Sequence, residues 1–260
     1  MKRFADNVLV VTGSAGDIGR AVALRFAREG AILALFDVRP SDATQAAVEA
    51  IGGEARSYRC DVTDAQSVQT AVNQVVSDFG KIDLLFNNAG YQGLFKKTHA
   101  YPQDDFFKVI NINLVGAFHV LRSVSEVMVK QGSGCIVNTA SMAGVGVPPN
   151  MIAYGSSKAA IISMTKIAAK DLAPYGIRVN AISPAFMGPG VMWDRQVALQ
   201  AQAGSPYYDS DPLVVEHQMV NEIPMHRLGD IKEIPGVVAF LMSDDASYIT
   251  GENVRIAGGV

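Results

Sequence analysis

VLVVTGSAGDIGRAVALRFAREG, residues 8–30, decides the fold of this chain. A run of apolar residues is followed by a glycine-rich turn and then by a segment with helical periodicity, the order typical of a dinucleotide-binding motif. Gly13 allows the tight turn. A helix that begins near Ile18 directs its free N–H groups and the positive end of its dipole at a pyrophosphate. Gly19, which has no side chain, allows close packing of the helix on the strand.

Outward from this motif, strand-like apolar runs alternate with longer helical segments. Strict alternation favours an α/β fold with a doubly wound parallel sheet, right-handed crossovers and strands covered on both faces. The length of 260 residues suits one large domain, 1–260, without a second one. The predicted strands are 8–11, 32–36, 56–60, 82–86, 135–138 and 178–182, and the predicted helices are 18–29, 42–51, 65–79, 104–130 and 151–173.

Composition and charge exclude several classes of protein. Apolar residues make up 49% of the chain and charged residues 18%, which excludes a disordered chain. A net charge of -3 supplies no basic field, so we expect neither nucleic acid nor an anionic membrane as a partner. No run approaches 18 uninterrupted apolar residues, so no transmembrane helix is expected. The N-terminal residues run directly into the first strand, so no signal peptide is expected.

The cysteines and histidines lack the spacing of a metal or disulfide site. Cys60 and Cys135 both lie in strand-like runs, and neither has a partner at metal-ligand spacing. We therefore expect buried, reduced thiols, as in a cytoplasmic protein. The four histidines form no HxxxH or HExxH pattern, so no catalytic metal is expected.

One segment, at about 185–225, departs from the alternation. It carries prolines, glycines and Trp193, with helical pieces between them. A long insertion at this depth of an α/β sheet is typical of a substrate lid over an active site. The alternative is a helical excursion that only packs on a partner subunit.

Residues at the ends of the predicted strands are candidates for cofactor binding. The carboxylate of Asp37 ends the second strand, where it would accept hydrogen bonds from an adenosine ribose and repel a 2′-phosphate, which favours NAD over NADP. Arg39 is a counter-signal, because guanidinium groups bind phosphates. Asp61 and Val62 end the third strand, near an adenine edge. After the fourth strand, Asn88 and Gly90 offer groups beside the cofactor, although Asp, Asn and Gly are also common in turns.

Three residues further along carry the equipment for moving a proton on or off an alcohol. Tyr154 and Lys158 stand at i and i+4, so they share a helix face. A lysine ammonium beside a phenol lowers the pKa of that phenol toward neutral pH, and Ser141 could share the substrate oxygen with it. By itself Tyr-x-x-x-Lys is common by chance, and its weight comes from the nucleotide motif upstream.

Together these motifs resemble the short-chain dehydrogenase/reductase family over essentially the whole chain. The matching pieces are TGSAGDIG (12–19), Asp37, CDV (60–62), NNAG (87–90), Asn113, Ser141, YGSSK (154–158) and IRVNAISP (177–184). The resemblance implies a single-domain Rossmann-type fold with seven parallel strands in the order 3-2-1-4-5-6-7, helices on both faces, and a homotetramer.

The resemblance also implies a role for each site residue. Tyr154 is the acid/base, and Lys158 lowers its pKa and holds the nicotinamide ribose. Ser141 positions the substrate oxygen. Asn113 kinks its helix and holds a water that relays protons to Lys158. Pro184 belongs to the segment that lies against the nicotinamide.

Three departures from the family pattern concern the cofactor. One is that the family's threonine near the carboxamide is replaced within Met187-Gly188-Pro189-Gly190. Asp17 stands where the family has its middle glycine; it can cap the helix, but its charge is unfavourable near a pyrophosphate unless it turns away. Ala185 replaces the glycine of the Pro-Gly pair after the sixth strand. We still expect NAD to bind, with altered contacts to the nicotinamide.

A closer match within the family rests on NNAGYQG (87–93), NTASMAGV (138–145), PPNMIAYG (148–155), SPAFMGPG (183–190), MWDRQVALQA (192–201) and DIKEIPGVVAFLMSDDASYITGENVRIAGG (230–259). These segments, which include much of the lid, resemble the bacterial NAD-dependent xylitol dehydrogenases. This resemblance implies transfer of a hydride between a secondary hydroxyl of a polyol and NAD, xylitol giving the ketose D-xylulose. Other sugar alcohols, a hydroxy acid derivative, a 3-oxoacyl thioester and a non-catalytic NAD-binding role stay open as alternatives. Gln92, Asn150 and Trp193 are candidate substrate residues beside Ser141, and packing under the lid is the alternative for Trp193.

Overall fold

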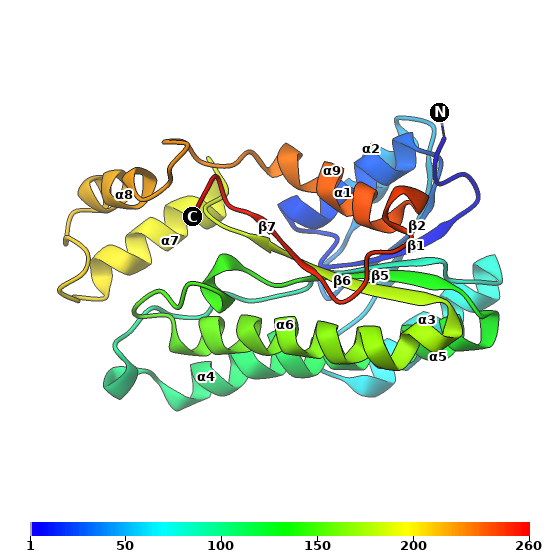
Figure 1. Ribbon diagram of the computed structural model, residues 1–260, viewed down its shortest axis with the longest axis horizontal. Coiled ribbons are helices and arrows are strands. Elements are labelled where there is room, and N and C mark those ends of the chain that lie inside the picture. The colour runs from blue at the N-terminus through cyan, green and yellow to red at the C-terminus, as the bar shows by residue number, and fades with distance from the viewer. Residues whose placement is uncertain (1) are drawn as a thin grey trace.

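Seven parallel strands form one sheet in the order β3-β2-β1-β4-β5-β6-β7, which confirms the predicted fold class and strand order. The computed structural model describes residues 2–260 (Figure 1). The strands are β1 Val8–Thr12, β2 Ile32–Asp37, β3 Glu54–Arg59, β4 Leu84–Asn87, β5 Gly134–Thr139, β6 Ile177–Pro184 and β7 Asn253–Ile256.

Helices cover both faces of this sheet, because successive side chains of each strand point to opposite faces. Leu9 and Val11 of β1 join the core under one helical layer, and Val8 and Val10 join the core under the other. The first layer holds α1 Asp17–Arg28, α2 Asp42–Glu49 and α9 Ile234–Met242, and the second holds α3 Ala65–Phe79, α4 Gln103–Ile110, α5 Gly116–Gln131 and α6 Ile152–Leu172 (Figure 1).

Local signals explain where helix α3 begins and ends, and its bounds match the predicted 65–79. The Asp64 carboxylate caps the helix by accepting a hydrogen bond from the Gln66 N–H at 2.9 Å. Gly80 ends the helix in the left-handed conformation, with φ at 79°.

Four elements differ from the prediction made from apolar runs, and one of them is strand β7, which no predicted strand covers. The single helix expected at 104–130 is α4 and α5 joined by a π-helical segment, η2 Asn111–Val115. Helix α9 escaped prediction because its second residue, Pro235, and Gly236 obscure the helical pattern. Strand β3 lies at the edge of the sheet and buries only Ala55 and Tyr58, so it is not covered on both faces as expected.

The helical segment Gln103–Gln131 is long and apolar enough to cross a membrane by length and composition alone. It contains no long uninterrupted apolar run, which is why the sequence predicted no transmembrane helix. Its packing offers another explanation. Val120, Val124 and Met128 are fully buried in the core beneath the sheet. A helix that covers a sheet in a globular core passes the same test.

The segment predicted as a lid folds into two helices at one end of the molecule, α7 Val191–Gln202 and α8 Pro212–Asn221 (Figure 1). The two helices pack against each other around a small core of their own, separate from both sheet-face cores: Trp193, Val197, Ala201, Val215 and Met219.

Short helical turns complete the chain: η1 Thr98–Ala100, η3 Met142–Gly144, η4 Ala173–Tyr175, η5 Ile231–Glu233 and η6 Asp244–Ala246.

Candidate active site

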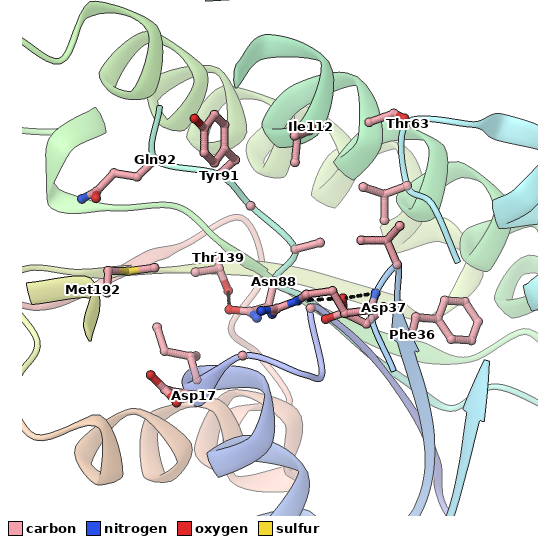
Figure 2. A pocket seen from close by; sticks show the side chains of 18 of the residues that line it. Asp17, Phe36, Asp37, Thr63, Asn88, Tyr91, Gln92, Ile112, Thr139 and Met192 are labelled. Carbon is pink, nitrogen blue, oxygen red and sulfur yellow. Dashed lines mark hydrogen bonds and ion pairs between the residues drawn. The ribbon is translucent and has the colours of Figure 1, made fainter. Parts of the chain in front are cut away.

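A cavity of about 690 Å³ opens where the first four strands end, with Asp17 on one side and Tyr91 and Ile112 on the opposite side (Figure 2). We call it the larger cavity. Ligands bind at this edge of open parallel sheets. Most of the residues predicted to bind cofactor line it: Gly13, Asp17, Ile18, Asp37, Asp61, Val62, Asn88, Gly90, Tyr154 and Lys158.

The glycine-rich turn forms the floor of the larger cavity. Gly13 has a positive φ of 68°, and a Cβ there would stand 3.0 Å from the Ala89 Cα. A Cβ on Gly19 would collide with the Gly13 carbonyl oxygen, so Gly19 acts by close packing and does not line the cavity. The turn thus leaves the start of helix α1 open to an anion.

Asp37 places a buried carboxylate at the end of β2, as the sequence predicted. One oxygen accepts a hydrogen bond from the Ala15 N–H at 3.0 Å, and the other accepts one from the Arg39 N–H at 2.9 Å. The Arg39 side chain is mostly exposed, with its Nε 3.6 Å from that carboxylate. A carboxylate fixed in this way has lone pairs left for a ribose diol and repels a 2′-phosphate.

The two other strand-end motifs are also part of the turn structure. The Asp61 carboxylate accepts hydrogen bonds from the Thr63 N–H at 2.9 Å and the Thr63 hydroxyl at 2.7 Å. The Asn88 amide donates to the Thr12 carbonyl at 3.2 Å and accepts from the Thr139 hydroxyl at 3.3 Å. Both residues therefore shape the wall of the larger cavity.

A second cavity of about 390 Å³, the smaller cavity, adjoins the larger one beneath the lid. Tyr154 lines both cavities, and Ser141 and Pro184 line the smaller one. Pro184 lines the smaller cavity and not the larger one, and its predicted contact with the nicotinamide stays a prediction. The arrangement sets the tyrosine hydroxyl between a nucleotide-sized space and a substrate-sized space.

The structure brings the four predicted catalytic residues together from three segments. Ser141 begins η3, where its Oγ accepts a hydrogen bond from the Ala143 N–H at 3.1 Å. The Lys158 Nζ donates to the Thr139 carbonyl at 2.7 Å and lies 5.7 Å from the centre of the Tyr154 ring. A Cβ on Gly90 would stand 3.4 Å from the Asn113 Oδ1 and 3.6 Å from the Lys158 Nζ, so both side chains converge on that glycine.

The pKa of Tyr154 moves in the direction opposite to the prediction. Burial raises it, and a hydrogen bond with Ser141 opposes that effect only in part. Burial also lowers the pKa of Lys158 to about 8. The prediction considered only the attraction between ammonium and phenolate, whereas withdrawal of both groups from water disfavours both charges.

Asn113 lies at the centre of the π-helical segment η2, which interrupts the regular α-helix at the predicted place, and is 1% exposed. Its Oδ1 accepts from the Tyr91 N–H at 2.7 Å, and its Nδ2 donates to the Tyr91 carbonyl at 2.9 Å and to Ser157 at 3.0 Å. These bonds fix the loop after β4 on helix α6. The water relay stays a prediction.

Two predicted substrate residues do not line the smaller cavity. Asn150 is buried, and its amide donates to Gln200 at 2.9 Å and to Ser205 at 3.1 Å. Trp193 is 3% exposed in the lid core, where its indole donates to Glu216 at 3.0 Å. Both predictions are wrong, because the lid itself satisfies these polar groups.

Gln92 does line both cavities, but its amide is engaged on both sides. Its oxygen accepts from Arg195 at 3.1 Å, and its nitrogen donates to Gln196 at 2.8 Å. Arg195 also donates to the Gly93 carbonyl at 2.8 Å. Gln92 therefore fastens helix α7 to the loop after β4.

Sequence reasoning missed several residues of the site. Thr12 and Thr139 orient the Asn88 segment and Lys158, and their position at strand ends was the available signal. Tyr208 and Glu222 line the smaller cavity from the lid, and nothing in their sequence context marks them.

The cysteines are free and buried, and burial raises the pKa of Cys60 to about 12 and that of Cys135 to about 11. Neither is poised as a nucleophile at neutral pH. Within residues 2–260, no group of three or more His, Cys, Asp and Glu side chains gathers as a metal site.

Comparison with known proteins decides the family. A family model described as enoyl-(acyl carrier protein) reductase, one of the short-chain dehydrogenase/reductases, matches residues 13–260. The levodione reductase of Leifsonia aquatica is 38% identical over 99% of this chain and 95% of its own length. The chain belongs to the short-chain dehydrogenase/reductase family.

Other members of the short-chain dehydrogenase/reductase family resemble the whole chain. The 3-oxoacyl-(acyl-carrier-protein) reductase of Thermotoga maritima is 36% identical over 99% of both chains. A crystal structure of an NAD⁺-bound xylitol dehydrogenase is 59% identical, with a TM-score of 0.98 over 99% of this chain and 100% of that one. Membership makes this short-chain dehydrogenase/reductase an oxidoreductase of a family that uses NAD or NADP and acts on small molecules.

Proposed function

We propose that this protein oxidises a secondary hydroxyl of xylitol to give D-xylulose, with NAD as the hydride acceptor. The observation that carries the proposal is the position of Tyr154, which lines both the larger and the smaller cavity. The 59% identity to a xylitol dehydrogenase supports the polyol. The alternatives with another sugar alcohol keep the same machinery.

The residues of the site would divide the work as follows. Ser141 and Tyr154 bind the reacting hydroxyl, and the Tyr154 phenolate takes its proton as general base. The Lys158 ammonium, held by the Thr139 carbonyl, favours that phenolate and passes protons toward Asn113. NAD, when bound, accepts the hydride from the carbinol carbon; Gly13, Ile18 and Asp37 would hold it.

Asp37 supports NAD in preference to NADP. Its carboxylate is buried and fixed by two backbone N–H groups, so it cannot turn away from a 2′-phosphate without losing both hydrogen bonds. The Arg39 side chain is mostly exposed but also lines the larger cavity, so its guanidinium stays the counter-signal to this preference.

A second candidate function is reduction of a small apolar ketone. Part of the smaller cavity is lined by Met142, Phe186, Met192 and Met219, and the Leifsonia aquatica relative is a levodione reductase. A 3-oxoacyl thioester on a carrier protein is less well supported, because no Lys, Arg or His of the described chain lines this cavity to dock an acidic partner.

Two further features are part of the proposal. Exposed apolar side chains on helices α4, α5 and α6, Phe107, Phe118 and Ile167, favour assembly into a homotetramer. The two buried free thiols favour a reducing compartment, the cytoplasm.

The test measures NADH formation with xylitol, sorbitol, galactitol, arabinitol and ribitol, each with NAD and with NADP. We expect xylitol turnover with NAD, and at least about 10³-fold lower kcat in Tyr154→Phe with unchanged NADH affinity, because the variant lacks only the hydroxyl. Activity of Tyr154→Phe within about tenfold of the parent would overturn the role of Tyr154. Silence with every polyol, together with reduction of apolar ketones by NADH, would favour the second candidate.

A further inference from the structure

Two walls of the smaller cavity differ in role. One holds the proposed catalytic residues, and the proposed function gives no role to the other, on the lid side. Ser141 and Tyr154 form the first wall. A five-carbon polyol bound there by one hydroxyl brings four more hydroxyl groups into the cavity. Each of them needs a hydrogen-bond partner, since a polar group that leaves water without one weakens binding.

Most polar side chains on the lid side are already engaged. The Gln92 amide is held by Arg195 and Gln196. The Gln200 amide accepts from Asn150 at 2.9 Å and donates to the Pro149 carbonyl at 3.5 Å. These groups hold the lid in place, so they are poor candidates for binding the far end of a substrate.

Glu222 is different. It follows the last residue of helix α8, lines the smaller cavity and is the one charged side chain among the described residues that do so. Within residues 2–260 no hydrogen bond or ion pair engages its carboxylate. Glu222 is exposed overall, but desolvation raises the pKa of its carboxyl. Burial, with a smaller contribution from the Glu222 charge, raises the pKa of Tyr208 to about 12. Glu222 and Tyr208 thus both line the smaller cavity from the lid side.

We propose that Glu222 is a specificity-determining residue whose carboxylate accepts hydrogen bonds from the distal hydroxyls of a neutral polyol and rejects phosphorylated or carboxylated substrates. This inference rests on the proposed function. Carboxylates are the strongest neutral-pH acceptors for hydroxyl donors. The same carboxylate repels an anion, and no cation lines the cavity of the described chain to offset that repulsion. Tyr208, which also lines the cavity, adds a hydroxyl that can donate or accept.

The test compares Glu222→Gln with Glu216→Gln. Both substitutions remove one negative charge from the same part of the lid, but Glu216 does not line the cavity, and a glutamine there still accepts from the Trp193 indole. We expect Glu222→Gln to raise KM for xylitol about tenfold, with kcat and KM for NAD changed less than about twofold, because a distal contact binds ground state and transition state alike. Glu216→Gln should match the parent.

A second arm measures reduction of D-xylulose and D-xylulose 5-phosphate with NADH. We expect the parent to prefer the neutral ketose by at least about tenfold in kcat/KM, and Glu222→Gln to narrow that preference. An unchanged KM for xylitol in Glu222→Gln, or equal kcat/KM for the two ketoses in the parent, would overturn the inference and leave the proposed function standing. If the parent oxidises no polyol, the proposed function itself fails.

Discussion

The buried Lys158 ammonium serves the proposed chemistry of the site, but its burial costs folding free energy. The side chain is 3% exposed, and its ammonium has the Thr139 carbonyl as its hydrogen-bond acceptor. Burial lowers its pKa from 10.5 to about 8. Because the unfolded chain holds that proton more tightly, the contribution of Lys158 to folding becomes more favourable as the pH rises from about 8 to 10.5.

Lys158→Met therefore should lose activity and change how stability depends on pH. Between pH 7 and pH 10 the folded parent loses the buried charge of Lys158 and so gains free energy of unfolding, whereas the variant has no such gain. The free energy of unfolding of the variant minus that of the parent should therefore fall by about 2–3 kcal/mol over this range. Urea unfolding at both pH values measures this difference. Lys166→Met, an exposed position on the same helix, should show no such dependence. A pH-independent difference for Lys158→Met would contradict the buried charge.

Asp17 is the residue at which this chain departs from its family in the nucleotide turn. It is the first residue of α1, lines the larger cavity and stabilises the helix dipole while opposing a pyrophosphate. Asp17→Asn should lower the Kd for NADH about threefold and reduce stability by about 0.5 kcal/mol. Fluorescence titration measures the affinity. Asp42→Asn, in the first turn of α2, should lose similar stability without a change in affinity; equal Kd values in all three proteins would refute the effect of Asp17.

At the scale of single residues, the sequence predicted the positions of the proposed catalytic residues better than those of the proposed substrate-binding residues. Ser141, Tyr154 and Lys158 converge as expected, because helical spacing and strand ends place them. Asn150 and Trp193 do not reach the cavity, because their partners Gln200 and Glu216 lie in the lid. Local sequence contains no sign of such long-range pairing.

The element that governs access to the site is helix α7, which two loops hold in place. Arg195 and Gln196 bind the loop after β4, and Gln200 binds Asn150 in the loop after β5. Gln200 is 1% exposed and Asn150 9% exposed, so the second attachment is shielded from water. The helix is thereby held at the smaller cavity by polar contacts in addition to its apolar face.

Arg195→Ala should loosen this attachment. We expect KM for xylitol to rise about five- to tenfold and the segment 203–211 to be cleaved faster by protease, because two charge-assisted hydrogen bonds are lost. Kinetics and limited proteolysis measure the two effects. Arg227→Ala, which removes an exposed ion pair with Glu233, provides the control. Protease resistance equal to that of the parent would show that apolar packing alone holds α7.

Regular elements were predictable where local signals agree, as at the capped helix α3. The π-helical segment η2 was not, because the bonds between Asn113 and the Tyr91 backbone that accompany it join residues 22 positions apart. Strand β7 pairs with β6 but has no fully buried residue, so its sequence shows no apolar run.

For the whole molecule, exposed apolar side chains are the basis of the proposed tetramer. Phe107 is 66% exposed, Phe118 50% and Ile167 59%, on three neighbouring helices. Phe118→Glu combined with Ile167→Glu should convert the proposed tetramer into smaller species at micromolar concentration, because charges cannot be buried there unpaired. Light scattering after size-exclusion chromatography measures the mass. Ile51→Glu, at the end of α2, should leave the mass unchanged, and a double variant of unchanged mass would place the interface elsewhere.

The separate core of the lid has a consequence for how this enzyme could diversify. Trp193, Val215 and Met219 bury one another without relying on the two cores of the sheet. Substitutions in α7 and α8 therefore perturb a small cooperative unit, while the nucleotide-binding scaffold keeps its folding free energy. Because the lid has its own core, substitutions there can change the substrate preference while the residues proposed for hydride transfer stay unchanged.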